Sequence, residues 1–233
     1  MTGTGTVHLA ARSAIQSNGT IVTGADTNLS APTLDLSNGN VIAHNIANLS
    51  AAGDITHQNA RLEASGVQFK AGGTVDNRGG AIVAGVNGGT VQGANILNQR
   101  GAITSGGGLG VGAAQAVDNT GGTIAGTSAT TVAAAGIVNR GGVIGSVQDK
   151  LLATGALDNT GGKALAATDI ALTGGPVIND HGQISAVRTL TADTGGQALV
   201  NTSGVIAAGN IQTSTGTTCC RWPWWMRPSA RMA

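Results

Sequence analysis

The sequence is poor in the residues that usually build a compact core or a reaction centre. Its 233 residues include no Tyr, one Phe, three Trp and two Cys, and only 10% of them are charged. The two cysteines, Cys219 and Cys220, are adjacent, so they cannot form a disulfide framework. A core must therefore come from aliphatic side chains in thin, regular layers.

Charge and hydropathy exclude further classes of protein. The formal net charge is +1, and Lys and Arg are scattered without a basic cluster, which disfavours a nucleic-acid partner. The opening residues, MTGTGTVHLA, lack the basic and apolar regions of a signal peptide. No run approaches the roughly 18 apolar residues of a membrane-spanning helix. The 39 glycines argue against helices in general, because Gly is costly in helix interiors.

What the sequence contains instead is a repeated phrase, such as VDNRGGAI at 75–82, VDNTGGTI at 117–124 and IVNRGGVI at 137–144. The residue that closes the phrase serves as an anchor, and successive anchors are 20–22 residues apart. The anchors are Ile21, Ile42, Leu62, Ile82, Ile103, Ile124, Ile144, Ala164, Ile184 and Ile206. A fixed period of this length is typical of a solenoid.

Two columns of recurring residues, one of Asn and one of Gly, run through the regular repeats. Five residues before the anchor stand Asn77, Asn98, Asn119, Asn139, Asn159, Asn179 and Asn201. Two residues before it stand Gly80, Gly101, Gly122, Gly142, Gly162, Gly182 and Gly204, which mark a turn with a left-handed or sterically tight backbone. Apolar, Asn and small residues recur at spacings of two, which are strand spacings. The sequence therefore predicts an all-β fold, a right-handed parallel β-helix of about ten coils of 20–22 residues.

The Asn column has two interpretations. If equivalent asparagines stack on successive coils, each amide donates to the next and the column is a buried structural ladder. Partnered amides are buried at acceptable cost, whereas one unpartnered amide is expensive. The alternative is a row of solvent-facing turn residues. The face that each Asn shares with the preceding apolar residue favours the buried ladder.

The chain divides into three segments. Residues 57–216 are expected to form regular coils, and residues 1–56 irregular ones. In the N-terminal repeats, Gln16, Ser37 and His57 stand where the Asn column should continue. The segment 217–233, TTCCRWPWWMRPSARMA, abandons the repeat and holds every Cys and Trp. We interpret it as an out-of-frame or otherwise non-native ending, with a sugar-stacking or membrane-interface patch as the alternative.

The repeat resembles a known family. LDNTGG at 157–162, followed by an aliphatic residue and TDIALTGG at 168–175, is similar to the hemagglutinin repeat of about 20 residues in filamentous hemagglutinin-like adhesins. The likeness covers 57–213 well and 10–56 loosely. It implies a β-helical shaft, export through an outer-membrane two-partner transporter, and attachment to a host or neighbouring cell through a glycan or protein receptor. The chain is then expected to be an internal piece or remnant of a longer secreted surface adhesin.

The resemblance also implies alternatives for function. The same shaft occurs in contact-dependent growth inhibition toxins, so a toxin stalk is the second hypothesis. The third is a polysaccharide-cleaving β-helix, which needs carboxylates clustered on neighbouring coils. Asp76, Asp118 and Asp158 lie two coils apart, about 10 Å, so solvated turn aspartates are favoured. We therefore predict no catalytic residues, no cofactor and no metal site.

Overall fold

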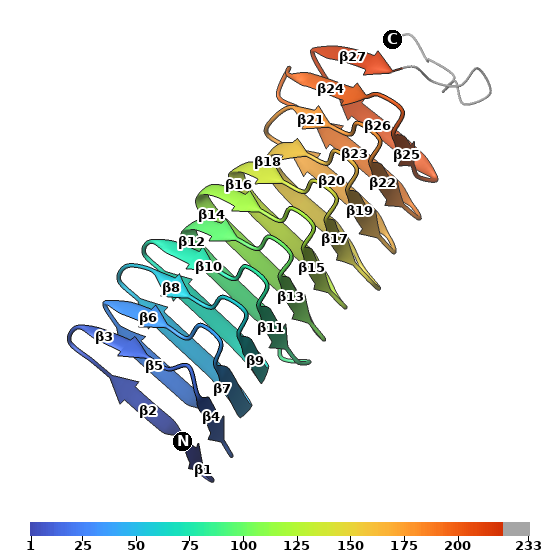
Figure 1. Ribbon diagram of the computed structural model, residues 1–233. Helices are drawn as coiled ribbons and strands as arrows, with labels where there is room; N and C mark the ends of the chain where they lie inside the picture. Colours follow the sequence, from blue (N-terminus) through green and yellow to red (C-terminus); the bar gives the residue numbers. More distant parts are fainter. Residues whose placement is uncertain (221–233) are drawn as a thin grey trace.

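The computed structural model describes residues 1–220, which contain strands β1 to β27 and no helix. The chain winds through about 11 turns stacked along one axis, so the ribbon rises steadily from the N-terminal to the C-terminal end (Figure 1). Every strand pair is parallel and joins residues about one repeat apart, such as Ile82 beside Ile103. The prediction of an all-β parallel β-helix is confirmed, while its right-handed winding stays a prediction.

Each turn contributes one short strand segment to each of three faces, here called faces A, B and C. Face A consists of β1 (Thr2–Gly3), β4 (Thr20–Thr23), the starts of β7 (Asn40–Ala51) and β9 (Arg61–Ala71), β11 (Ala81–Ala84), β13 (Ala102–Ser105), β15 (Thr123–Gly126), β17 (Val143–Ser146), β19 (Lys163–Ala166), β22 (Gln183–Ala186) and β25 (Val205–Ala207).

Face B follows in each turn. It consists of β2 (Val7–Ala10), β5 (Thr27–Ala31), the ends of β7 and β9, the starts of β12 (Gly89–Leu97), β14 (Leu109–Asp118), β16 (Thr130–Val138) and β18 (Leu151–Asp158), then β20 (Asp169–Thr173), β23 (Thr189–Asp193) and β26 (Asn210–Ser214).

Face C closes the turn. It consists of β3 (Ala14–Gln16), β6 (Thr33–Asp35), β8 (Ile55–Thr56), β10 (Thr74–Asp76), the ends of β12, β14, β16 and β18, then β21 (Val177–Ile178), β24 (Ala198–Asn201) and β27 (Thr217–Cys220). The pairing of β27 with β24 carries the stack to Cys220, and the rest of the predicted tail, 221–233, lies outside the described residues.

The core is a set of aliphatic columns that run along the axis. On face A, Ile82, Ile103 and Ile124 are each at most 1% exposed and lie directly above one another. Face B adds a second column that includes Phe69 and Val91, and face C a third that includes Val117. No single turn encloses a core of its own, so burial comes from stacking, as in other solenoids.

One predicted anchor is wrong. The register places Val41 between Ile21 and Leu62, and Val41 is 2% exposed, whereas Ile42 is 38% exposed on the outer surface. Two adjacent aliphatic residues satisfied the repeat equally well in the sequence. Because strand side chains alternate between faces, a shift of one residue exchanges the inside and the outside of the rod.

Candidate functional site

The seven predicted ladder asparagines lie at the bend between face C and face A, stacked in a single column. Asn77 to Asn179 are fully buried, and Asn201 is 6% exposed. In each of the first six, the side-chain Nδ2 donates to Oδ1 of the next Asn at 2.7 Å, and this series from Asn77 to Asn201 is here called the asparagine ladder. All of the side chains therefore point the same way along the axis.

The ladder also holds the backbone of the bend. Besides Oδ1 of Asn119, the Nδ2 of Asn98 approaches the carbonyl oxygens of Gly101 at 3.3 Å and Thr123 at 3.1 Å. The backbone N–H of Asn98 donates to the carbonyl of Asp118 at 2.7 Å. One side chain thus joins two turns, and its buried polar atoms are satisfied, as a buried amide requires.

His57 begins the polar column. Its Nδ1 lies 2.8 Å from Oδ1 of Asn77, and because that oxygen only accepts, Nδ1 must carry the proton. The remaining ring nitrogen, Nε2, is buried without a hydrogen-bond partner. The ring packs edge-on against Phe69, with 5.7 Å between the ring centroids. Burial lowers the pKa of His57, although the hydrogen bond that His57 donates to Asn77 raises it. A neutral imidazole therefore supplies the donor that the first amide of the ladder needs.

In the two turns that precede His57, the residues at the column position differ from those expected from the sequence. Leu36, not Ser37, aligns with His57, since the N–H of Leu36 donates to Thr56 just as the N–H of His57 donates to Asp76. Likewise Ser17, not Gln16, takes this position in the first turn, since its N–H donates to Asp35. Leu36 is 1% exposed, so an apolar side chain fills the bend there. The prediction of Ser37 was counted from Ile42. Because the buried anchor is Val41, the predicted column position is also displaced by one residue.

The glycine column serves close approach and not left-handed geometry. A Cβ at Gly122 would overlap the carbonyl oxygen of Asn98 and lie 2.7 Å from Oδ1 of Asn119. The residue with positive φ is the one before it: Gly121 in this turn, and Arg100 in the preceding one. The column Gly80, Gly101, Gly122, Gly142, Gly162, Gly182 and Gly204 thus lets each turn lie against the amide of the ladder.

The aspartates beside the ladder are engaged in hydrogen bonds. Asp76, Asp118 and Asp158 lie on alternate turns, separated by Leu97 and Val138. Each Oδ2 accepts from the turn before, in order from Gln58, Gln99 and Arg140. The sequence analysis did not identify these three donors. Each stands one residue after the polar column, on the turn that precedes the aspartate.

The pKa values of two of these aspartates are lowered. Burial raises the pKa of Asp76, but hydrogen bonds from Arg78 and Gln58 outweigh it. Burial likewise raises the pKa of Asp158, and the hydrogen bonds from Arg140 and Thr160 outweigh it. Both groups are therefore held as carboxylates, which suits hydrogen-bond acceptors of a turn and not a general acid.

Titratable side chains are dispersed elsewhere in residues 1–220. No group of three or more His, Cys, Asp or Glu lies close enough to hold a metal ion there. His181 contacts the neighbouring Asp180 on the surface, and its side chain is 70% exposed. The arrangement at the bend joins neighbouring turns through side-chain and backbone hydrogen bonds.

Comparison with known proteins gives the family. A model of the haemagglutinin repeat matches the chain three times, at residues 2–79, 59–120 and 113–175. No curated protein and no solved structure matches the chain. The matched residues cover most of the sequence and coincide with the stacked turns, so the chain belongs to the haemagglutinin repeat family of filamentous haemagglutinin-like shafts.

Proposed function

We propose that this chain is a stiff shaft segment of a secreted bacterial surface adhesin, exported by the two-partner route and mediating attachment to a host or neighbouring cell. The observation that carries the proposal is the uninterrupted stack: about 11 turns follow one another in the described residues with no inserted domain. At about 4.8 Å per turn, this is a rod about 50 Å long. The haemagglutinin repeat is typical of secreted surface adhesins, which supports the same role.

The physical task of such a shaft is reach. Each turn pairs only with the turns before and after it, so length grows by adding repeats without changing the cross-section. The asparagine ladder and the backbone pairing both run along the axis and resist separation of neighbouring turns. Stiffness along this axis is what holds a binding surface away from a cell.

Attachment and export are tested separately. Beads coated with the purified 233-residue chain should be retained on epithelial monolayers or bacterial lawns well above beads coated with albumin. For export, the chain is fused behind a two-partner secretion domain and expressed with its transporter, and it should become accessible to added protease on intact cells. Beads that bind neither surface would contradict attachment, and a fusion that stays protected would contradict export.

A stalk of a contact-dependent toxin uses the same shaft. The DNA that flanks the gene distinguishes the two functions. A toxin domain that continues in frame, followed by an immunity gene, supports the toxin stalk. An adhesin frame without a toxin supports the proposal above.

A further inference from the structure

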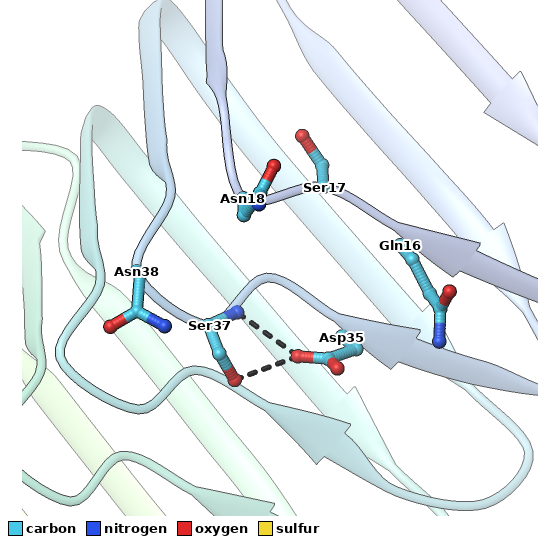
Figure 2. Close-up of a pocket in the computed structure, with 6 residues that line it drawn as sticks. All are labelled: Gln16, Ser17, Asn18, Asp35, Ser37 and Asn38. Atoms are coloured by element: carbon cyan, nitrogen blue, oxygen red, sulfur yellow. Dashed lines mark hydrogen bonds between the residues drawn. The ribbon is translucent and has the colours of Figure 1, made fainter.

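The first two turns contain an open polar pocket at the bend where side chains of later turns bridge to an aspartate of the next turn. A cavity of about 380 Å³ lies at the bend between face C and face A, next to β3 and β6. Its lining is entirely polar and comes from two successive turns, Gln16, Ser17 and Asn18 from one and Asp35, Ser37 and Asn38 from the next (Figure 2). Its volume falls in the range of small-molecule sites, about 300–1,000 Å³.

Asp35 differs from the other aspartates of its column. Its Oδ1 accepts from the N–H of Ser37 at 3.1 Å and from the hydroxyl at 2.7 Å, the same local turn that Asp118 forms with Thr120 (Figure 2). In Asp76, Asp118 and Asp158, the second oxygen accepts from a side chain of the preceding turn. Oδ2 of Asp35 accepts no hydrogen bond within residues 1–220.

The missing donor has a simple cause. Asn18 occupies the position of Gln58 and Gln99, one residue beyond the column, but its side chain is one methylene shorter. It makes no hydrogen bond to Asp35, and the side-chain amides of Gln16 and Asn38 are also without a partner among the described residues. Three amides and one carboxylate oxygen of solvent-exposed residues thus line the cavity without a protein partner (Figure 2).

We infer that this pocket binds a neutral sugar residue, with hydroxyl groups donating to Asp35 Oδ2 and exchanging hydrogen bonds with the amides of Gln16, Asn18 and Asn38. A sugar offers hydroxyls that both donate and accept, which matches a lining of amides, hydroxyls and one carboxylate. An anionic ligand would be repelled by Asp35. A Ca²⁺ ion requires six to eight oxygen ligands, usually several carboxylates, and leaves the amide N–H groups unused.

The inference rests on the proposed attachment role and locates one contact for it. The ¹⁵N-labelled chain is titrated with methyl α-mannoside, methyl β-galactoside and N-acetylglucosamine, and backbone amide shifts are followed by NMR. At least one sugar should shift residues 16–18 and 35–38 selectively, with affinity in the millimolar range expected for so small a ligand. The Asp35→Asn variant keeps an oxygen for Ser37 but removes the charge, and should weaken binding at least about tenfold.

Asp158→Asn is the matched control, because the same local turn is present and the carboxylate is already taken by Arg140. It should leave the sugar-dependent shifts unchanged. The inference is overturned if no sugar shifts these residues, or if CaCl₂ alone produces the same shifts. Either result leaves the bead experiment untouched, and beads that attach equally well with Asp35→Asn would show attachment through another surface.

Discussion

The bend between face C and face A is built in two ways along the same rod. From His57 to Asn201 it is filled by stacked polar side chains, whereas Leu36 fills it with an apolar one. Each Oδ1 of the ladder accepts a hydrogen bond from the preceding residue of the column. The first Asn therefore needs a donor that is not itself part of the ladder. His57 starts it with one N–H, at the expense of an unpartnered Nε2. Either an apolar or an amide side chain can therefore fill the bend, but the junction between the two needs a residue that donates one hydrogen bond, as His57 does.

The largest expected effect is on the aliphatic columns, which both regions share. Ile124→Ala should lower the free energy of unfolding by about 4 kcal/mol, because the buried side chain leaves a cavity between two turns. Urea unfolding followed by circular dichroism measures it. Ile42→Ala is the control for register and should cost less than about 0.5 kcal/mol, as a substitution on the outer surface. Equal losses for the two variants would contradict the register of the first turns.

Breaking the ladder in the regular region should have the next largest effect. Asn119→Ala removes the donor to Oδ1 of Asn139 and the acceptor of Nδ2 of Asn98, and should cost about 2 kcal/mol. The same denaturant titration measures the loss. The matched control is Asn87→Ala, whose amide is exposed and bonds only Ser65. A negligible loss at Asn119 would favour turn asparagines that water could satisfy.

Replacing His57, the residue that donates to the first Asn of the ladder, tests what the junction requires. His57→Asn should place an amide in line with the others and remove the buried Nε2, raising stability by about 1 kcal/mol at neutral pH. The pH dependence should change as well. With the pKa of His57 lowered in the folded state, the unfolded chain takes up the proton first, so stability falls as pH drops below about 6.5.

Thermal melting of both proteins between neutral and mildly acidic pH measures this effect. The part of the decline below about pH 6.5 that comes from His57 should vanish in His57→Asn. A wild-type protein whose melting temperature falls no more steeply than that of the variant would contradict a neutral, buried His57.

The smallest effect concerns the left-handed residue of the bend. Arg100 has φ of +56°, where its neighbours in the column, Gly79 and Gly121, are glycines. Arg100→Gly should stabilise the chain by about 0.5 kcal/mol, as relief of backbone strain exceeds the entropy cost of Gly. The thermal unfolding curve measures it, with Arg12→Gly as a control on an exposed bend without a positive φ that should gain nothing. Destabilisation by Arg100→Gly would show that the strain is absent.

Much of the fold could be predicted because the same residues recur in the sequence every 20–22 positions. The Asn, Gly and anchor columns define the turns wherever the phrase is kept, from Asn77 onward. The register failed at Val41 and Ile42, where two aliphatic residues stand side by side and only packing selects the buried one. The open pocket could not be predicted, since it depends on the Asn18 side chain being too short to reach Asp35 on the next turn.

The most direct measurement for the stacked solenoid is hydrogen exchange of the asparagine side-chain amides by NMR. The Nδ2 protons of Asn98, Asn119 and Asn139 should exchange orders of magnitude more slowly than those of Asn18 and Asn38, because the first three side chains are buried and hydrogen-bonded between turns. Exchange of the ladder amides as fast as that of Asn18 would contradict the buried ladder.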